Sequence, residues 1–317
     1  MPAKPVLTRS DGVEAPDAPP PPRRDKNRHT LSGHLFLSPW ILGFVALTAG
    51  PVLASLYLAF TRYNLLSPPS WAGLDNFVRM FSDPHFLNSA QVTIIYVFVS
   101  VPLQLALALF LAVVLDKGLR GLAIYRSGYY LPSLLGASVA VAVLWRRIFG
   151  YDGLLNGVLD IFGVEPTSWL QNTSTALGTL IVLNVWTFGS PMIIFLAGLR
   201  QIPHDLYESA LLDGAGAIRR FWSITVPMLT PMIFFNLIIQ FINAFQAFTP
   251  SYVVSGGTGG PNGSTMFYTL YLYIQGFRNF DMGYAAALGW VLLIAIAVLT
   301  AINFIASRYW VFYADEK

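Results

Sequence analysis

Long apolar runs separated by short polar connections dominate this chain. Six runs contain no charged residue and are long enough to cross the ~30 Å hydrocarbon core of a bilayer, which takes about 20 helical residues. They span approximately residues 35–60, 90–115, 127–145, 175–199, 228–249 and 284–307. The pattern predicts an all-α, polytopic membrane protein with six transmembrane helices, in which residues 35–307 form the membrane domain.

A proline-rich, basic segment precedes the first run. Residues 1–34 contain the run Pro19–Pro22, a basic stretch at 23–28 and little apolar material, so we expect a disordered cytoplasmic tail. The alternative is a signal peptide cleaved near Leu53-Ala54-Ser55. The run 35–60 exceeds the ~7–15 residues of a signal-peptide core, which favours an uncleaved first span.

Composition and charge agree with a membrane protein. The chain is 55% hydrophobic and only 11% charged, whereas soluble domains are about 25% charged. It has no cysteine, which excludes disulfides and thiolate metal sites. The net charge of +3 is small and argues against a nucleic-acid partner, so the lipid bilayer is the expected environment.

The distribution of Lys and Arg orients the six spans. These residues collect in cytoplasmic segments of membrane proteins. With the N-terminus inside, 14 of the 19 Lys and Arg residues fall in inner segments. The outer segments hold Arg62, Arg79, Arg146, Arg147 and Arg278. Both termini, with residues 308–317 as a C-terminal tail, are therefore expected in the cytoplasm.

One polar stretch, residues 200–227, interrupts the apolar pattern on the predicted inner side. Pro203 suits a first helical turn, Glu208 lies near that positive end, and Asp213-Gly214 is a helix stop signal. A second helix is expected from near Ala217, with Ile218, Phe221, Trp222 and Thr225 on one face. The first helix combines small residues with an apolar body, which suits docking into a cleft of another protein.

At these residues the chain resembles the EAA loop (E-A-A-x3-G-x9-I-x-L-P) of membrane subunits of binding-protein-dependent ABC importers. The matching residues are Glu208, Ala210, Gly214, Ile224 and Pro227, and the departures are Ser209 and Val226. The resemblance implies a type I ABC importer permease fold and a coupling helix that docks into an ATPase subunit. The residues it assigns to this contact are Leu206, Tyr207, Glu208, Ser209, Ala210, Asp213, Gly214 and Ala215. Glu208 would pair with a basic side chain of that partner or with Arg200; an ordinary cytoplasmic loop is the alternative.

The longer match from Ile202 to Ala215 resembles the carbohydrate-uptake branch of these importers, which includes the maltose and glycerol-3-phosphate systems. It implies a bacterial cell-membrane permease subunit that moves a sugar, polyol or oligosaccharide delivered by an extracytoplasmic binding protein. A second permease chain, expected to be a different one, and two ATPase subunits complete such an importer. ATP and Mg²⁺ would be bound by the ATPase subunits, so this chain is expected to be no enzyme and to hold no cofactor.

Polar side chains within two spans are candidates for a solute pathway, because a polar group in a bilayer is costly unless it is paired or lines a wet cavity. Asn236, Gln240, Asn243 and Gln246 recur every three or four residues and share one helical face. No charge lies on that face, which favours a neutral solute. The alternative role of these amides is to hold helices together, at ~1 kcal/mol each or less.

The other candidate span, 175–199, contains Gly189 and Pro191, which can loosen a helix. Its Asn184-Val-Trp186 is similar to an Asn-Leu-Trp in the sugar-contacting helix of the maltose permease. The resemblance assigns the substrate pathway to Asn184, Thr187, Phe188, Gln240, Asn243 and Ala244.

Other chemistry is weakly indicated. The four histidines lack metal-ligand spacing, and the glycine-rich stretch 255–264 lacks the Lys-Ser/Thr of a phosphate-binding loop. That stretch is expected to be a flexible surface loop that meets a delivering protein, or else a plain connector. The second functional hypothesis, an ion-coupled secondary transporter or channel, predicts intramembrane acids or broken inverted repeats, and neither is evident.

Overall fold

The computed structural model describes residues 36–116, 122–136 and 138–312. The predicted tail at 1–34 and residues 313–317 of the predicted C-terminal tail lie outside these ranges. Contacts divide the chain into two units, Met1–Leu53 and Ala54–Lys317. In the described residues the secondary structure is helical except for one antiparallel pair of strands, β1 (Thr61–Arg62) and β2 (Ser70–Trp71).

The first candidate span is the 24-residue helix Phe36–Ala59, close to the predicted 35–60. Its middle, Val45–Ala49, is a π-helical stretch, and α2 follows as Gly50–Ala59. In the first unit, Trp40 stacks on Phe44 with ring centroids 5.5 Å apart. By length and composition this helix can cross a membrane.

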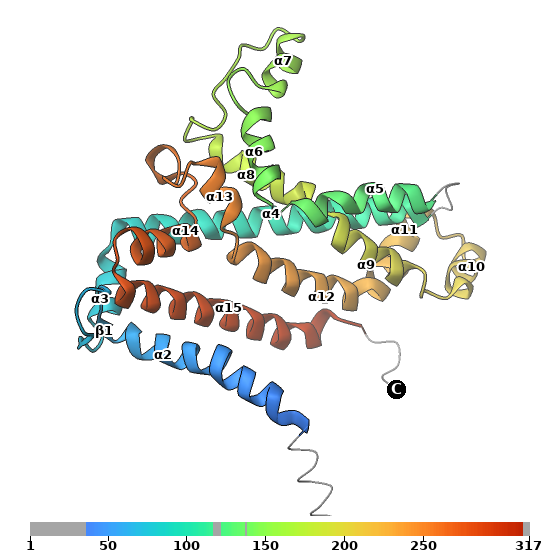
Figure 1. Ribbon diagram of the computed structural model, residues 1–317. Coiled ribbons are helices and arrows are strands. Elements are labelled where there is room, and N and C mark those ends of the chain that lie inside the picture. Colours follow the sequence, from blue (N-terminus) through green and yellow to red (C-terminus); the bar gives the residue numbers. More distant parts are fainter. Residues whose placement is uncertain (1–35, 117–121, 137, 313–317) are drawn as a thin grey trace, which may run out of the picture. The chain divides into compact units, whose positions relative to one another are not determined.

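The second unit is a bundle of helices joined mostly by short turns (Figure 1). Its α-helices after α2 are α3 (Asp75–Ser82), α4 (Pro84–Asp116), α5 (Leu122–Leu135), α6 (Val139–Ile148), α7 (Leu154–Asp160), α8 (Ala176–Trp186), α9 (Gly189–Leu199), α10 (His204–Leu212), α11 (Ala217–Arg220), α12 (Val226–Phe245), α13 (Thr249–Val254), α14 (Tyr268–Tyr273) and α15 (Met282–Trp310). Tighter or wider turns occur at η2 (Phe221–Thr225), η3 (Pro261–Gly263) and η4 (Ile274–Arg278).

Helix α4 is the centre of this bundle. It packs against α8, α9 and α12, and α12 also packs against α15 (Figure 1). Its buried stripe runs through Val97, Val101, Ala108 and Ala112, at helical spacing. The small side chains let neighbouring helices approach closely, which is how helices associate in a membrane.

Two of the six predicted spans are broken helices. Four runs form single candidate spans, and the run 175–199 forms α8 and α9, which meet at 41°. The run 127–145 was expected to be one span, and it forms two helices, α5 and α6, which meet at 98°. The hydroxyl of Ser138 accepts a hydrogen bond from Val141 N (3.3 Å) and caps α6 as a new helix.

The fifth span begins much earlier than predicted. The second helix of the polar stretch starts at Ala217, as expected, but it continues without a break through η2 and α12 to Phe245. The candidate span that contains it extends to Val254. Pro231 lies inside it, and the hydroxyl of Thr230 donates to the carbonyl of Pro227 (2.6 Å). That bond satisfies the carbonyl that the missing proline N–H leaves free, so the helix persists.

Candidate functional site

A polar cavity of about 570 Å³ lies between α12 and the junction of α8 and α9. Gln240, Asn243 and Gln246 contribute amides from the α12 side, and Asn184 and Thr187 face the cavity from the other side. None of the residues that line it is charged. The cavity therefore offers hydrogen-bond donors and acceptors without the ionic partners that an anion or cation would need.

Side chains from other helices form hydrogen bonds with the backbone at the break between α8 and α9. The Thr187 carbonyl accepts hydrogen bonds from Gln104 Nε2 (3.1 Å) and Ser133 Oγ (2.8 Å). Gln104 Nε2 also donates to the Thr187 hydroxyl (2.9 Å). A helix break inside a membrane is tolerated only where the freed backbone groups find partners, so these bonds stabilise the junction. Asn184 contributes a further bond, from Nδ2 to Ser100 Oγ of α4 (3.0 Å).

The structure brings together four of the six predicted pathway residues: Asn184, Thr187, Gln240 and Asn243 line the cavity. Phe188 and Ala244 do not line it, because both are buried in the apolar core, 8% and 3% exposed. Sequence reasoning missed Gln104 and Ser133. The only signal for Gln104 was its polar amide within the largely apolar run 90–115, and its partner Thr187 is 83 residues away.

Gly189 allows α9 to approach α5 beside the cavity. A Cβ at this position would lie 2.3 Å from the Tyr129 carbonyl oxygen and 2.8 Å from Tyr130 Cα. We expect Gly189→Ala to lower stability by about 1–3 kcal/mol through overpacking. Thermal unfolding in detergent checks this, with Gly178→Ala as the control, since nothing lies within 4 Å of a Cβ there. Equal midpoints for the two variants would contradict the close packing.

Helix α10 forms a second candidate site at one end of the bundle (Figure 1). None of its residues is buried, and its last apolar side chain, Leu212, is 91% exposed. Gly214, with φ +72°, ends the helix in the left-handed conformation that favours glycine. The hydroxyls of Tyr207 and Thr225 lie 2.9 Å apart and join α10 to the base of the fifth span. The predicted break at Asp213-Gly214 is therefore present, but only the first of the two helices is short, because the second continues into α12.

A groove of about 770 Å³ lies beside α10. Ile218, Phe221, Trp222 and Thr225, the predicted apolar face of the second helix, all line it, and Tyr207 joins them from α10. Large apolar side chains here, with Ile218 78% exposed and Trp222 65% exposed, form a surface of the kind used for protein contacts.

Most of the predicted coupling residues are accessible. Five are exposed (Leu206, Glu208, Ser209, Asp213 and Gly214), and three are partly buried (Tyr207, Ala210 and Ala215). Glu208 does not pair with Arg200, because in the described residues Arg200 Nε lies 3.6 Å from Asp116 Oδ1. Glu208 is therefore left available at the surface.

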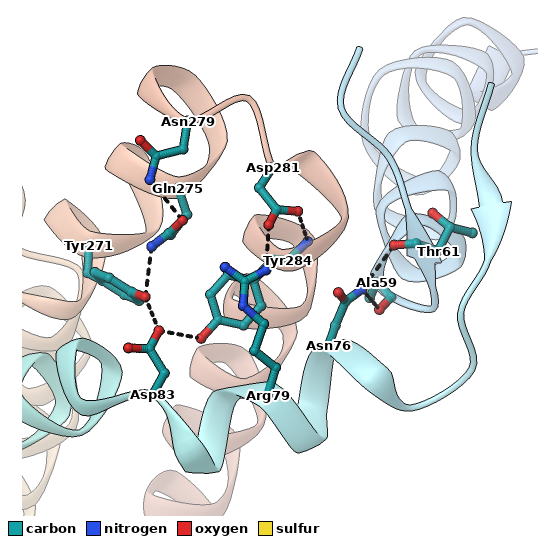
Figure 2. Close-up of polar contacts among 10 residues, drawn as sticks. All are labelled: Ala59, Thr61, Asn76, Arg79, Asp83, Tyr271, Gln275, Asn279, Asp281 and Tyr284. Carbon is teal, nitrogen blue, oxygen red and sulfur yellow. Dashed lines mark hydrogen bonds and ion pairs between the residues drawn. The ribbon is translucent and has the colours of Figure 1, made fainter. Parts of the chain in front are cut away.

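At the opposite end of the bundle a polar cluster fastens α3 and α4 to α14 and α15 (Figure 2). The carboxylate of Asp83 accepts hydrogen bonds from the hydroxyls of Tyr271 and Tyr284, the latter at 3.1 Å. Gln275 Nε2 donates to the Tyr271 hydroxyl (2.8 Å). Burial raises the pKa of Tyr271 to about 12. Burial alone would raise the pKa of Asp83, but these hydrogen bonds and those from backbone amides hold it below its ordinary value.

An ion pair extends this cluster. Arg79 Nη1 lies 2.6 Å from Asp281 Oδ2, and the Arg79 guanidinium lies over the Tyr284 ring, 4.2 Å from its centroid (Figure 2). Burial lowers the pKa of Arg79, but the pairing with Asp281 outweighs it and raises the pKa overall. Nearby, Asn76 Nδ2 donates to the carbonyls of Ala59 (2.8 Å) and Thr61 (2.9 Å). The cluster closes this end of the bundle and contributes no residue to the amide-lined cavity.

The lowered pKa of Asp83 gives a pH-dependent contribution to stability. A depressed carboxyl pKa stabilises the fold above its unfolded value of about 3.9, and this contribution is lost as the pH falls through the folded value. We expect Asp83→Asn to lower the thermal midpoint at pH 7, and the difference from the unaltered protein to shrink below about pH 4. Asp152→Asn, at an exposed position, is the control and should show no such difference. A constant difference from pH 7 to pH 3 would contradict this interpretation.

The comparisons with known proteins define the family. Residues 81–311 match the family described as "Binding-protein-dependent transport system inner membrane component". The chain is 49% identical over 296 residues to a probable ABC transporter permease, YesP, of Bacillus subtilis, covering 93% of this chain and 96% of that protein. It is 34% identical to the lactose transport system permease LacF of Rhizobium radiobacter, covering 89% and 96%.

A solved structure shares the fold. The crystal structure of a bacterial alginate ABC transporter, in complex with an alginate pentasaccharide-bound periplasmic protein, contains a chain that matches with a TM-score of 0.72. The identity is 22%, and the match covers 90% of this chain and 96% of that chain.

The chain therefore belongs to the family of inner-membrane permease components of binding-protein-dependent ABC transporters. It is an integral membrane transport subunit of type I ABC importer fold, and ATP hydrolysis belongs to a separate subunit. In the described residues no group of three or more His, Asp or Glu side chains is placed to hold a metal ion.

Proposed function

We propose that this subunit carries a neutral sugar or sugar oligomer through the amide-lined cavity. The uncharged lining supports this substrate class, because paired amide donors and acceptors match hydroxyl groups. Phe248 adds an aromatic ring to the lining, and rings of this kind cover the apolar face of a pyranose. The name of the relative LacF, a lactose transport system permease, points to the same class.

We also propose that α10 is the coupling helix and docks into a cleft of the ATPase. Its apolar side chains are exposed, and its acidic Asp205 lies in the first turn, where the helix dipole favours negative charge. The groove lined by Ile218 and Trp222 adjoins it and enlarges the surface available to a partner. The contacting residues would be those at 206–210 and 213–215.

The observation that carries the mechanism is the continuous helix from Ala217 to Phe245, formed by α11, η2 and α12. Its first turns line the groove beside α10, and its later turns line the cavity through Gln240 and Asn243. Closure of the ATPase subunits against α10 would thus move the cavity wall as part of one rigid element. Rocking of such elements would switch access to the cavity from one side of the membrane to the other.

The proposal places α10, both termini and the ATPase subunits in the cytoplasm. Two ATPase subunits and a second permease chain would complete the transporter, and a binding protein outside the cell would deliver the solute. The distribution of basic residues supports this orientation, because 14 of the 19 Lys and Arg residues fall in the segments predicted on the same side of the membrane as α10.

Affinity purification of this chain from mild-detergent extracts of its own cell membranes tests the assembly. We expect one ATPase and one further permease chain to co-purify, identified by mass spectrometry. Membrane vesicles holding that complex and its binding protein should accumulate at least one of a panel of radiolabelled neutral sugars, and should do so only with ATP. Purification of this chain with no ATPase would overturn the proposal.

A further inference from the structure

Asn236 lies next to the amide-lined cavity, on the side toward α10. It precedes Gln240 by four residues and Asn243 by seven on α12, so all three share one helical face. At 1.5 Å per residue, Asn236 lies about 6 Å from Gln240 along the helix axis, toward the α10 end. Gln240 and Asn243 line the cavity, whereas Asn236 is only 1% exposed.

The buried amide of Asn236 is unpaired in the described part of the chain. Neither its Nδ2 nor its Oδ1 has a hydrogen-bond partner among the described residues. Other buried amides have at least one partner: Gln104 donates through Nε2 to Thr187, although its Oε1 is unpartnered, and Asn156 Nδ2 donates to the carbonyl of Tyr151 at 2.8 Å. An unpartnered buried amide destabilises the fold, so its presence on this face calls for a role in another state of the molecule.

On the α10 side of Asn236, helix α9 packs closely against α12. On α9, Ile194 lines the cavity, and Gly198 follows one turn later on the same face. A Cβ on Gly198 would lie 2.8 Å from both Leu229 Cδ2 and Met232 Cγ. Met232 is one turn before Asn236, so Asn236 lies between the cavity and a tight apolar contact of the two helices.

We propose that Asn236 is a second solute-contacting residue, which becomes accessible when α9 and α12 separate at Gly198 and Met232. Its amide would then donate to and accept from the hydroxyl groups of a neutral, hydroxylated solute that has left the Gln240–Asn243 level. The inference rests on the proposed function, since it assumes that the cavity is the transport path. It adds a polar position between that cavity and the α10 end.

Single-cysteine labelling tests the change in accessibility. The chain has no cysteine of its own, so a thiol introduced by Asn236→Cys is the only one on this subunit. The assembled transporter is placed in lipid nanodiscs, nucleotide-free or trapped with ATP and vanadate, and treated with a charged, water-soluble methanethiosulfonate. Gln240→Cys is the accessible reference and Leu288→Cys, fully buried on α15 away from the Gly198 contact, the inaccessible one.

We expect Asn236→Cys to react at least tenfold faster in one nucleotide state than in the other. Equal rates in both states, or no reaction while Gln240→Cys is labelled, would overturn the inference and leave the proposed function intact. Absence of labelling at Gln240→Cys in both states would instead show that the cavity is not a water-accessible path, and the proposed function would fail with it.

A second variant separates this role from a structural one. Asn236→Leu replaces the amide by an apolar group of similar size and removes two unpartnered polar atoms. The thermal midpoint of the assembled transporter is expected to stay the same or rise. A lowered midpoint would show that the amide serves the fold, which would contradict the inference.

Discussion

Replacing Glu208 by arginine is expected to abolish ATP-driven solute uptake while the chain still inserts into the membrane. Glu208 is exposed on α10 and has no ion-pair partner in the described part of the chain. Reversing a charge at a protein–protein contact costs several kcal/mol, and each 1.4 kcal/mol is about tenfold, so we expect uptake to fall more than tenfold. Uptake into membrane vesicles, with the amount of inserted chain measured in parallel, checks this result.

Glu165→Arg is the matched control for this charge reversal. Glu165 is also exposed, but it lies in the connection between α7 and α8, away from α10. The control should retain normal uptake. Normal uptake in Glu208→Arg would remove the assignment of α10 as the coupling helix.

The second large effect is expected from the cavity amides. Gln240→Leu and Asn243→Leu each remove a hydrogen-bonding group from the cavity lining without adding volume that the cavity cannot hold. Loss of a bond to a hydroxylated solute is worth about 0.5–1.5 kcal/mol, so each change should weaken apparent solute affinity roughly twofold to tenfold. Solute-dependent uptake rates measure the affinity, and co-purification of the ATPase should not change.

Asn303→Leu provides the control for these substitutions. Asn303 is an amide in the membrane-spanning helix α15, but its Nδ2 donates to the Leu299 carbonyl of its own helix (2.9 Å) and it does not line the cavity. Normal apparent affinity in both cavity variants would return Gln240 and Asn243 to the structural role of holding helices together.

Helix content and the position of the spans were predictable from the sequence because both follow from local patterns. The apolar run ending near residue 60 became the helix Phe36–Ala59, and Asp213-Gly214 ends α10 as expected. The grouping of Gln240 with Asn243 follows from helical spacing alone. These features depend on residues within a few turns of one another.

Features that depend on distant partners were not predictable. The right-angle turn between α5 and α6 was missed, since the run 127–145 is uncharged and continuous. The stabilisation of the Thr187 carbonyl needs Gln104, which is on another helix. Phe188 and Ala244 were assigned to the pathway by resemblance, and their burial in the core depends on how the helices rotate against each other.

The joining of the helix that begins at Ala217 to the predicted fifth span at 228–249 was also missed. The joined helix contains Pro227 and Pro231. Proline usually ends a helix because it removes one backbone donor. Here the Thr230 hydroxyl takes over the freed carbonyl of Pro227.

Transport by purified protein in liposomes tests the central claim, that motion enters this chain from a separate ATPase through α10. Vesicles holding the complete complex, with its binding protein and a labelled neutral sugar, should move the sugar only when ATP is supplied. Vesicles holding this chain alone should move none. Sugar movement by the chain alone, at a rate comparable to that of the complex, would contradict the account.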